Sequence, residues 1–204
     1  MRIADAFNLK IRDCFGKDDN DDVPSFDFSQ LGGDSTAWGV SKFVIFPSGN
    51  LNKVIKIPFE GVWEYNSEIE DEEWFEFEVI KDYCAEEAAI YDEAVEAGLE
   101  CFFAKTEFGG FTKDGTKFYI ADRVKPFDWH RATEGSEKKA NEIRCSLDSI
   151  WIANAIDCYG LDKVNELVAF LWDRNLHDFH DGNVGMREDG SPVLLDYSDY
   201  KEEW

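Results

Sequence analysis

The most informative segment of the sequence is LHDFHDGNVG at residues 176–185, and VLLDY follows it at residues 193–197. Asp178 precedes Asn183 by five residues, and Asp196 follows Asn183 by thirteen. Magnesium accepts carboxylate and amide oxygens as ligands, and a carboxylate beside a hydroxyl can receive its proton during phosphoryl transfer. The spacing therefore predicts a phosphate and metal site, while a polar turn held by Asp and Asn hydrogen bonds would give similar letters.

A short hairpin is expected around this stretch. NVGMRE and SPVLLDY are separated by the Asp189-Gly190 dipeptide, which favours a tight turn between two strands. Such a hairpin can bring Asn183 and Asp196 to the same end of a cleft. The C-terminal part of the chain is thus predicted to carry the chemistry.

Upstream, the pattern is first β and then helical. Residues 1–25, with the acidic run GKDDNDDV at 16–23, are expected to form a lead-in and a solvated loop. Apolar and β-branched runs then predict three antiparallel strands up to Phe59, and helical spacing predicts one amphipathic helix that ends at Gly98. Two further strands, CFFAKTEF and KFYIADRV, are expected to join through turns at residues 109–115 and to complete a five-stranded sheet.

Helical spacing returns from Ser136 to Asn175, in two segments that break at Tyr159-Gly160. The second segment is clear, because its apolar residues recur at helical intervals along one face. Five strands with one inserted helix, then helices, then a small hairpin indicate an α+β fold.

The C-terminal stretch resembles the catalytic loop and the metal-binding strand of the protein-kinase superfamily. The resemblance implies that Asp178 is the catalytic base and that Asn183 and Asp196 hold Mg²⁺ against the phosphates of ATP. It also implies a two-lobed protein-kinase-like fold. Residues 1–124 would be the N-lobe, a five-stranded antiparallel sheet with one helix, and residues 125–204 a truncated, mainly helical C-lobe.

Lys56 lies in KVIKI among apolar residues, where a lysine is costly unless its ammonium meets an anion. By resemblance it is the third-strand lysine that contacts the α and β phosphates. An edge-strand lysine that points to solvent is the alternative. The family pairs this lysine with a helix glutamate, for which Glu87 is the first choice and Glu86 the second.

Two further segments are assigned by position. LGGDSTAWG takes the place of the glycine-rich cover over the phosphates, so Gly32 and Gly33 are expected to contact nucleotide, although the later glycine positions hold other residues. FYIADRVKP takes the place of the hinge, so backbone groups from Asp122 to Val124 are expected to meet adenine. Ordinary strand and linker residues would fit this second segment equally well.

The nearest likeness is to the short kinase domains carried by tailed bacteriophages and to the D-x-H-x-G-N loop of aminoglycoside- and choline-type phosphotransferases. His180 matches the histidine of that loop and is expected to contact the nucleotide.

Three features depart from the family pattern. Leu176 stands where H-x-D has its histidine, with His177 one position later. Asp196-Tyr-Ser replaces D-F-G, which removes the flexible joint that glycine provides. The sequence ends at Trp204, so no activation segment or A-P-E motif is expected, and a substrate would use a different surface.

The charge balance limits the choice of partners. Forty-four acidic residues against 21 basic ones leave a formal net charge of -23. Binding to nucleic acid needs clustered Lys and Arg, so direct nucleic-acid binding is excluded and a basic protein partner is favoured.

The cysteines and the termini indicate location. Five cysteines without a CxxC pair suggest neither a disulfide framework nor a zinc site, and reduced, mostly buried thiols are expected. The N-terminus has no apolar signal core, and no run approaches the length of a membrane span. A cytoplasmic protein is expected, in the host cytoplasm if it is phage-encoded.

The acidic stretch EYNSEIEDEEWFEFE, residues 64–78, has two readings. It could dock a basic target through Trp74, Phe75 and Phe77, or be a solvated insertion whose aromatic residues touch the sheet.

The leading hypothesis is an ATP- and Mg²⁺-dependent phosphotransferase that acts on a host protein or on itself. One alternative is a pseudokinase or acidic decoy that inhibits a basic, DNA-binding host protein. A second is a small-molecule kinase. Transfer of a nucleotide would need the same metal ligands.

Overall fold

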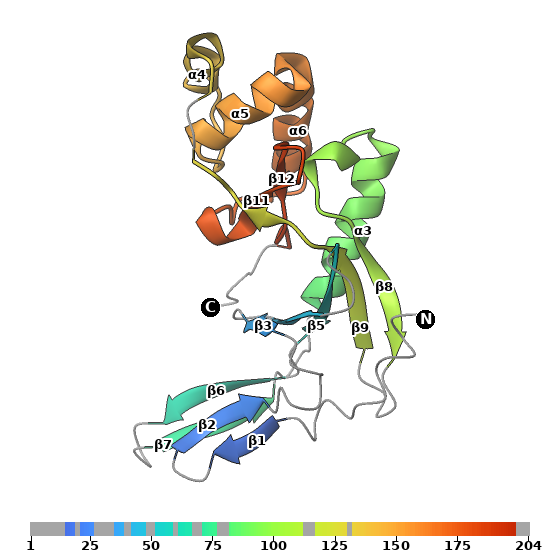
Figure 1. The fold of residues 1–204 in the computed structure, drawn as a ribbon, viewed down its shortest axis with the longest axis vertical. Coiled ribbons are helices and arrows are strands. Elements are labelled where there is room, and N and C mark those ends of the chain that lie inside the picture. Colours follow the sequence, from blue (N-terminus) through green and yellow to red (C-terminus); the bar gives the residue numbers. More distant parts are fainter. Residues whose placement is uncertain are drawn as a thin grey trace. The chain divides into compact units, whose positions relative to one another are not determined.

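The computed structural model has an α+β architecture, which confirms the predicted fold class (Figure 1). It describes residues 15–18, 21–26, 35–38, 42–47, 52–58, 61–66, 71–76, 82–111, 117–129 and 132–198. The chain divides into two compact units. The first unit is Met1–Ala85 with Thr106–Ala121, and the second is Glu86–Lys105 with Asp122–Trp204.

The first unit is built on a sheet with the strand order β3-β4-β5-β9-β8. Its strands are β3 (Ser35–Trp38), β4 (Lys42–Phe46), β5 (Lys53–Pro58), β8 (Thr106–Phe111) and β9 (Lys117–Asp122). β3 pairs with β4, β4 with β5, and β8 with β9, all antiparallel. β5 therefore has a neighbour on each side, and its residues Val54, Ile55 and Ile57 are buried.

The strand predicted at residues 101–108 is shifted in the structure. A short 3-10 helix, η2 (Glu100–Phe102), takes its first residues, and β8 runs on through the two glycines that were expected to turn. The register shifts between Phe108 and Gly110, and Gly110 has φ +130°. The glycines thus form a β-bulge, because an extra residue in one strand needs a backbone conformation that glycine adopts without strain. The turn predicted at Asp114-Gly115 lies outside the described residues.

Two hairpins occur where the sequence predicted no strands. β1 (Phe15–Asp18) pairs with β2 (Asp21–Phe26), so residues 16–18 and 21–23 of the acidic run lie in strands and not in a loop. β6 (Gly61–Asn66) pairs with β7 (Asp71–Glu76) and places Trp63 opposite Trp74. Aromatic residues favour strands whatever the charge of their neighbours. The sequence nevertheless predicted no strands here, because the many acidic residues suggested solvated segments.

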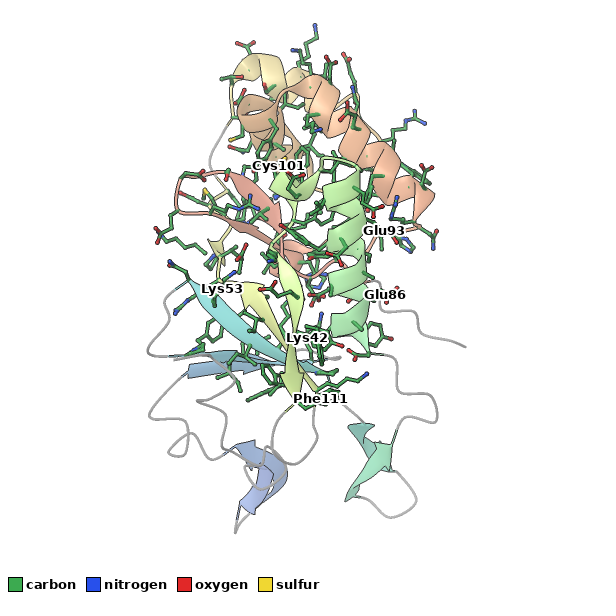
Figure 2. The ribbon with its side chains drawn as sticks, turned by 90° about the vertical axis from the view of Figure 1, so that its right-hand side faces the viewer. Lys42, Lys53, Glu86, Glu93, Cys101 and Phe111 are labelled. Atoms are coloured by element: carbon green, nitrogen blue, oxygen red, sulfur yellow. The ribbon has the colours of Figure 1, made fainter. Side chains whose placement is uncertain are left out.

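Helix α3 (Tyr83–Glu96) begins where Asp82 accepts a hydrogen bond from the main-chain nitrogen of Ala85 at 3.0 Å. The other carboxylate oxygen of Asp82 accepts from the Tyr119 hydroxyl of β9 at 2.6 Å. Burial and then this hydrogen bond raise the pKa of Tyr119, so the phenol stays a proton donor. The helix ends before Gly98, as predicted, because Gly98 has φ +68°. Figure 2 labels Glu86 and Glu93 on this helix.

The second unit holds the large hydrophobic core. The chain from residue 132 to 198 forms α4 (Glu134–Ala140), α5 (Ser149–Tyr159) and α6 (Leu161–Asp173). The predicted break at Tyr159-Gly160 is confirmed, and Gly160 has φ +87°. The helical segment predicted before it is instead two helices, because Asp148 accepts a hydrogen bond from the Ile150 nitrogen at 2.6 Å and starts a new one.

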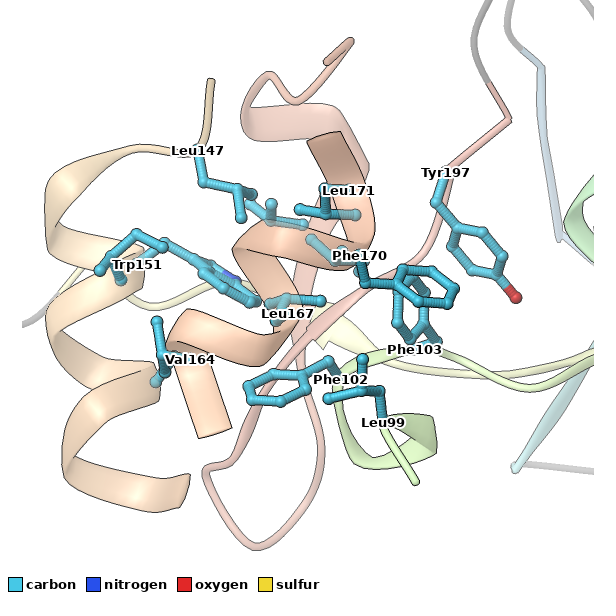
Figure 3. Close-up of a cluster of buried hydrophobic side chains, with 14 of the residues drawn as sticks. Leu99, Phe102, Phe103, Leu147, Trp151, Val164, Leu167, Phe170, Leu171 and Tyr197 are labelled. Atoms are coloured by element: carbon cyan, nitrogen blue, oxygen red, sulfur yellow. The ribbon is translucent and has the colours of Figure 1, made fainter. Parts of the chain in front are cut away.

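This core joins helices and loops that are distant in sequence. Figure 3 shows its centre, where Trp151, Leu167, Phe102 and Phe103 are fully buried. Phe103 packs edge to face on Phe170 of α6, with ring centroids 5.7 Å apart. The apolar face of α6 that the sequence indicated is therefore the face that enters the core.

The predicted C-terminal hairpin is confirmed. β11 (Val184–Met186) pairs with β12 (Pro192–Leu194), and β10 (Lys125–Pro126) adds a third strand beside β11. The 3-10 helix η3 (Asp181–Asn183) leads directly into β11. β10 belongs to the segment predicted as a hinge, so that segment is tied to the hairpin.

Two general expectations can be compared with the described residues. None of the helices in the described part of the chain is long and apolar enough to cross a membrane. The four cysteines described are free thiols, but only Cys84 is buried, so the expectation that most thiols are buried is wrong for these four. Cys14 lies outside the described residues.

Candidate phosphate and metal site

The loop that carries Asp178 starts at the end of α6. Asn175 adopts φ +56°, and the main-chain nitrogen of Leu176 donates to the oxygen of Leu171 at 2.9 Å. Leu176 is buried, so the chain is anchored in the core two residues before Asp178, whose side chain is exposed. The apolar residue in the place of the H-x-D histidine thus anchors the loop by packing.

Asn183 joins this loop to the hairpin. Its side-chain nitrogen donates to the main-chain oxygen of Asp178 at 2.7 Å, and its main-chain oxygen accepts from the Leu195 nitrogen at 3.0 Å. The side chain is 93% buried, since its exposed fraction is 7%. Because the amide nitrogen is used, the amide oxygen is the atom left to act as a ligand. The hydrogen bonds of Asn183 therefore link Asp178 to the residue before Asp196.

Asp196 follows this tie directly and is half-buried. The next residue, Tyr197, is held by two contacts. Its hydroxyl donates to the Ala104 main-chain oxygen at 2.8 Å, and its ring packs on Phe103 with ring centroids 4.9 Å apart. Ser198 is also buried, and its hydroxyl has no hydrogen-bond partner within the structure described. A buried hydroxyl without a partner is unfavourable, and in native proteins it usually meets water, an ion or a ligand.

His180 serves the loop itself. Its Nδ1 accepts a hydrogen bond from the Gly182 nitrogen at 3.0 Å and caps η3. The main-chain oxygen of His180 accepts from the Asn183 nitrogen at 2.8 Å. The ring is exposed, so Nε2 remains open to solvent or to a ligand. A side chain on Gly182 would meet the imidazole at 2.8 Å, which explains the glycine.

The hinge residues lie against the same hairpin. The main-chain nitrogen of Asp122 donates to the Lys105 oxygen at 2.9 Å, and the Asp122 carboxylate accepts from the Lys105 nitrogen at 3.3 Å. Val124 approaches Gly185 of β11 so closely that a side chain there would meet its Cγ2 at 2.8 Å. Gly185 is thus required where β10 pairs with β11.

Lys56 is in β5 and only 6% exposed. The alternative of an edge-strand lysine that points to solvent is therefore wrong, because β5 is flanked by β4 and β9. Lys42 of β4 is also buried, at 2% exposed, and the sequence analysis missed it. Its position among apolar residues of a strand could have indicated it.

The glutamates of α3 differ in burial. Glu87 is completely buried and Glu86 is half-buried, which favours the first choice made from the sequence. A fully buried carboxylate is retained only where polar or charged groups compensate its lost hydration. Gly32 and Gly33 lie outside the described residues.

One structural clamp was not found from the sequence. Arg187 donates from Nη1 to the Cys101 oxygen at 2.6 Å and from Nη2 to the Phe103 oxygen at 2.9 Å. The Tyr159 hydroxyl donates to the Cys101 oxygen at 3.1 Å, and burial raises its pKa, so it remains a neutral donor. The clamp holds the hairpin against η2, but nothing in the local sequence marks an arginine that binds main-chain oxygens.

Within the described part of the chain, no cluster of three or more His, Cys, Asp or Glu side chains could hold a metal ion by itself. The predicted ligands are one amide and one carboxylate, which is a smaller set. No protein-family model matches the chain, and no curated protein matches it.

Proposed function

We propose that this protein is an ATP- and Mg²⁺-dependent phosphotransferase with a protein-kinase-like site. The observation that carries the proposal is the tie through Asn183, which links the Asp178 loop to the strand end that bears Asp196. A loop carboxylate and two oxygen ligands near one another are what phosphoryl transfer needs.

The donor set fits magnesium bound together with nucleotide. Mg²⁺ usually keeps several waters and takes one or two carboxylates plus phosphate oxygens, so the Asn183 amide and the Asp196 carboxylate suffice as protein ligands. The orphaned hydroxyl of Ser198, two residues after Asp196, supports this fit. A water or phosphate oxygen held at the metal would supply the partner that the hydroxyl lacks.

The proposed roles follow from exposure and burial. Asp178 is exposed, so an incoming hydroxyl can reach its carboxylate and lose its proton there. Lys56 is buried in the sheet of the first unit and is proposed to bind the α and β phosphates; Glu87 is the glutamate that the family resemblance assigns to it. Bound magnesium would neutralise the charge that develops on the transferred phosphate. His180, Asp122 and Val124, together with the glycines 32 and 33, are proposed to contact ATP.

The finer fold is part of this proposal. Residues 1–124 are proposed to be the N-lobe and residues 125–204 the C-lobe of a minimal kinase, whereas the second compact unit also contains α3 from Glu86 onward. The position of α3 between β5 and β8 in the chain supports this, because the predicted N-lobe has one helix inserted after its third strand. The substrate is proposed to be a protein hydroxyl, and the site of action the cytoplasm.

The test combines binding with transfer. Thermal unfolding of the wild type is measured with ATP, with and without Mg²⁺, and compared with Asp196→Ala and Asp178→Ala; the same samples receive γ-phosphate-labelled ATP. We expect Mg²⁺-dependent stabilisation that Asp196→Ala loses and Asp178→Ala keeps, with label absent from both variants. Equal behaviour of the two variants would refute the separate roles.

A second candidate rests on charge. A net charge of -23 favours association with a basic protein, and the protein could do this without turnover. In that case Mg²⁺ and ATP would cause no shift and no label, while a basic partner would still bind.

A further inference from the structure

A cleft of about 480 Å³ opens in the second unit, between the end of α6 and the loop that precedes α5. Its lining includes Arg144, Cys145, Leu171, Trp172, Leu176 and His177. Clefts of 300–1,000 Å³ with mainly apolar walls are typical binding sites. This cleft ends at His177, the residue directly before Asp178.

Trp172 is the unusual wall of this cleft. Its side chain is 67% exposed, although α6 buries its other large apolar residues in the core. The indole nitrogen donates to the main-chain oxygen of Arg144 at 3.3 Å, so the ring is fixed in place. A fixed and exposed tryptophan offers a large apolar contact at little entropic cost, as the anchors of protein interfaces do.

The floor of the cleft is apolar and unreactive. Leu171 and Leu176 are buried at its base. Burial raises the pKa of Cys145, so this thiol is neutral and acts as a further apolar wall. The cleft is therefore suited to an uncharged, bulky side chain.

Acidic residues stand next to the lining residues of the cleft in the sequence. Asp173 follows Trp172, Asp178 follows His177, and Asp148 follows the loop at residues 144–146; all three are exposed. Arg144 is the opposing charge among the lining residues. The net charge of -23 favours a positively charged occupant.

We propose that the cleft, here called the Trp172 cleft, holds a bulky apolar side chain of a Lys- or Arg-rich peptide whose Ser or Thr is phosphorylated at Asp178. The inference rests on the proposed function and names its substrate class. Neighbouring Cα atoms are about 3.8 Å apart, so a peptide that reaches Asp178 can place a nearby side chain beside His177.

Other occupants fit the charges less well. A second copy of this chain carries the same net charge of -23, and like charges oppose such an association. A nucleic acid would be repelled for the same reason. A small polar molecule would leave the exposed face of Trp172 without contact.

The test uses defined peptides and no nucleotide. Fluorescein-labelled nonapeptides carry one Ser and one Phe, with Lys and Gly elsewhere, and the Phe stands one, two or three residues before or after the Ser. Their affinity for the full-length protein is measured by fluorescence anisotropy, and peptides with Gly for Phe, or Glu for Lys, serve as controls. We expect at least one spacing to bind, and both control changes to weaken it.

Three variants identify the cleft. Trp172→Ala should weaken binding about tenfold, as loss of a central aromatic anchor does. Asp173→Lys should weaken binding as well, because it adds a positive charge beside the cleft. Arg144→Glu should strengthen binding, because it removes a positive charge. It should leave Trp172 in place, since the indole nitrogen donates to the main-chain oxygen of Arg144 and not to its side chain. Circular dichroism and thermal unfolding confirm that the variants fold, as expected for exposed positions.

The two proposals fail differently. The same peptides are incubated with γ-phosphate-labelled ATP and Mg²⁺. If the peptides are labelled, and Trp172→Ala and Arg144→Glu do not change the amount of label, the cleft proposal is overturned and the phosphotransferase proposal is kept. Cleft-dependent binding without label at any spacing would keep the cleft and overturn the phosphotransferase. Failure of every peptide to bind would overturn the cleft.

Discussion

The side-chain nitrogen of Asn183 donates to the main-chain oxygen of Asp178 at 2.7 Å. One residue thus has two tasks in the proposed site, because its nitrogen holds the loop and its oxygen is left for a metal. Substitutions that separate these tasks are informative. Asn183→Asp retains an oxygen ligand and loses the donor, whereas Asn183→Ala loses both.

We expect Asn183→Ala to abolish Mg²⁺-dependent stabilisation by ATP, and Asn183→Asp to keep part of it. Both should lower stability by about 1 kcal/mol through the lost hydrogen bond, which is a fall of about 2–4 °C in Tm for a chain of this size. Titration of Mg²⁺ at fixed ATP, followed by thermal unfolding, measures both effects. Equal Mg²⁺ dependence in the two variants would mean that the amide oxygen is no ligand.

Two buried lysines on adjacent strands provide a matched pair. Lys56 is 6% exposed and Lys42 is 2% exposed, so Lys56→Met and Lys42→Met make similar changes in the same sheet. We expect Lys56→Met to reduce ATP binding at least tenfold, because the phosphates lose a charge-assisted contact. Lys42→Met should bind ATP as the wild type does. Isothermal titration with MgATP decides between them, and equal losses would remove the phosphate role from Lys56.

Ser198 allows a test with effects of opposite sign. Ser198→Ala removes a buried hydroxyl that has no partner in the part of the chain described, so the protein without ligand should be equally stable or more stable. Its stabilisation by MgATP should be smaller than in the wild type, because the proposed partner of the hydroxyl arrives with the ligand. Ser198→Thr, which keeps the hydroxyl, is the control. An unchanged MgATP effect in Ser198→Ala would make the hydroxyl irrelevant to the site.

Local signals predicted the fold where local chemistry decides it. Gly160, with its φ of +87°, breaks the helical region where the sequence indicated, and Asp189-Gly190 turns the predicted hairpin. The glycine at position 110 predicts a turn, but the structure has a β-bulge there. Turns and bulges both favour glycine, and only the pairing of β8 with β9 distinguishes the two. The hairpin of β1 and β2 was missed because charge suggested a solvated loop.

The candidate site, like the fold, was only partly predictable from the sequence. The spacing of Asp178, Asn183 and Asp196 could be recognised in the sequence, and the structure links Asn183 to the Asp178 loop and to Leu195. Lys42 and Arg187 were missed, since their burial and their contacts depend on strands and carbonyls contributed from elsewhere in the chain. Trp172 was equally hidden, because an apolar residue on an amphipathic helix is expected to be inside.

The acid sensitivity of α4 gives a last prediction. Asp157 accepts hydrogen bonds from the Ser136 hydroxyl at 2.6 Å and from the Thr133 hydroxyl and nitrogen, both at 2.8 Å. Partial burial acts to raise its pKa, but these hydrogen bonds outweigh it, and the pKa lies below its ordinary value of 3.8. A carboxyl with a lower pKa in the folded state stabilises the protein above its unfolded pKa. That stability is lost as pH falls through the folded value.

Asp157→Asn should therefore lower stability at pH 7 by an amount that shrinks as the pH drops below about 4. Urea unfolding of both proteins from pH 7 to pH 3 measures the difference directly, which removes the common contribution of the other carboxylates. Asp162→Asn is a suitable control, because Asp162 is exposed on α6. A difference that stays constant with pH would mean that Asp157 acts on α4 through its shape and not through its charge.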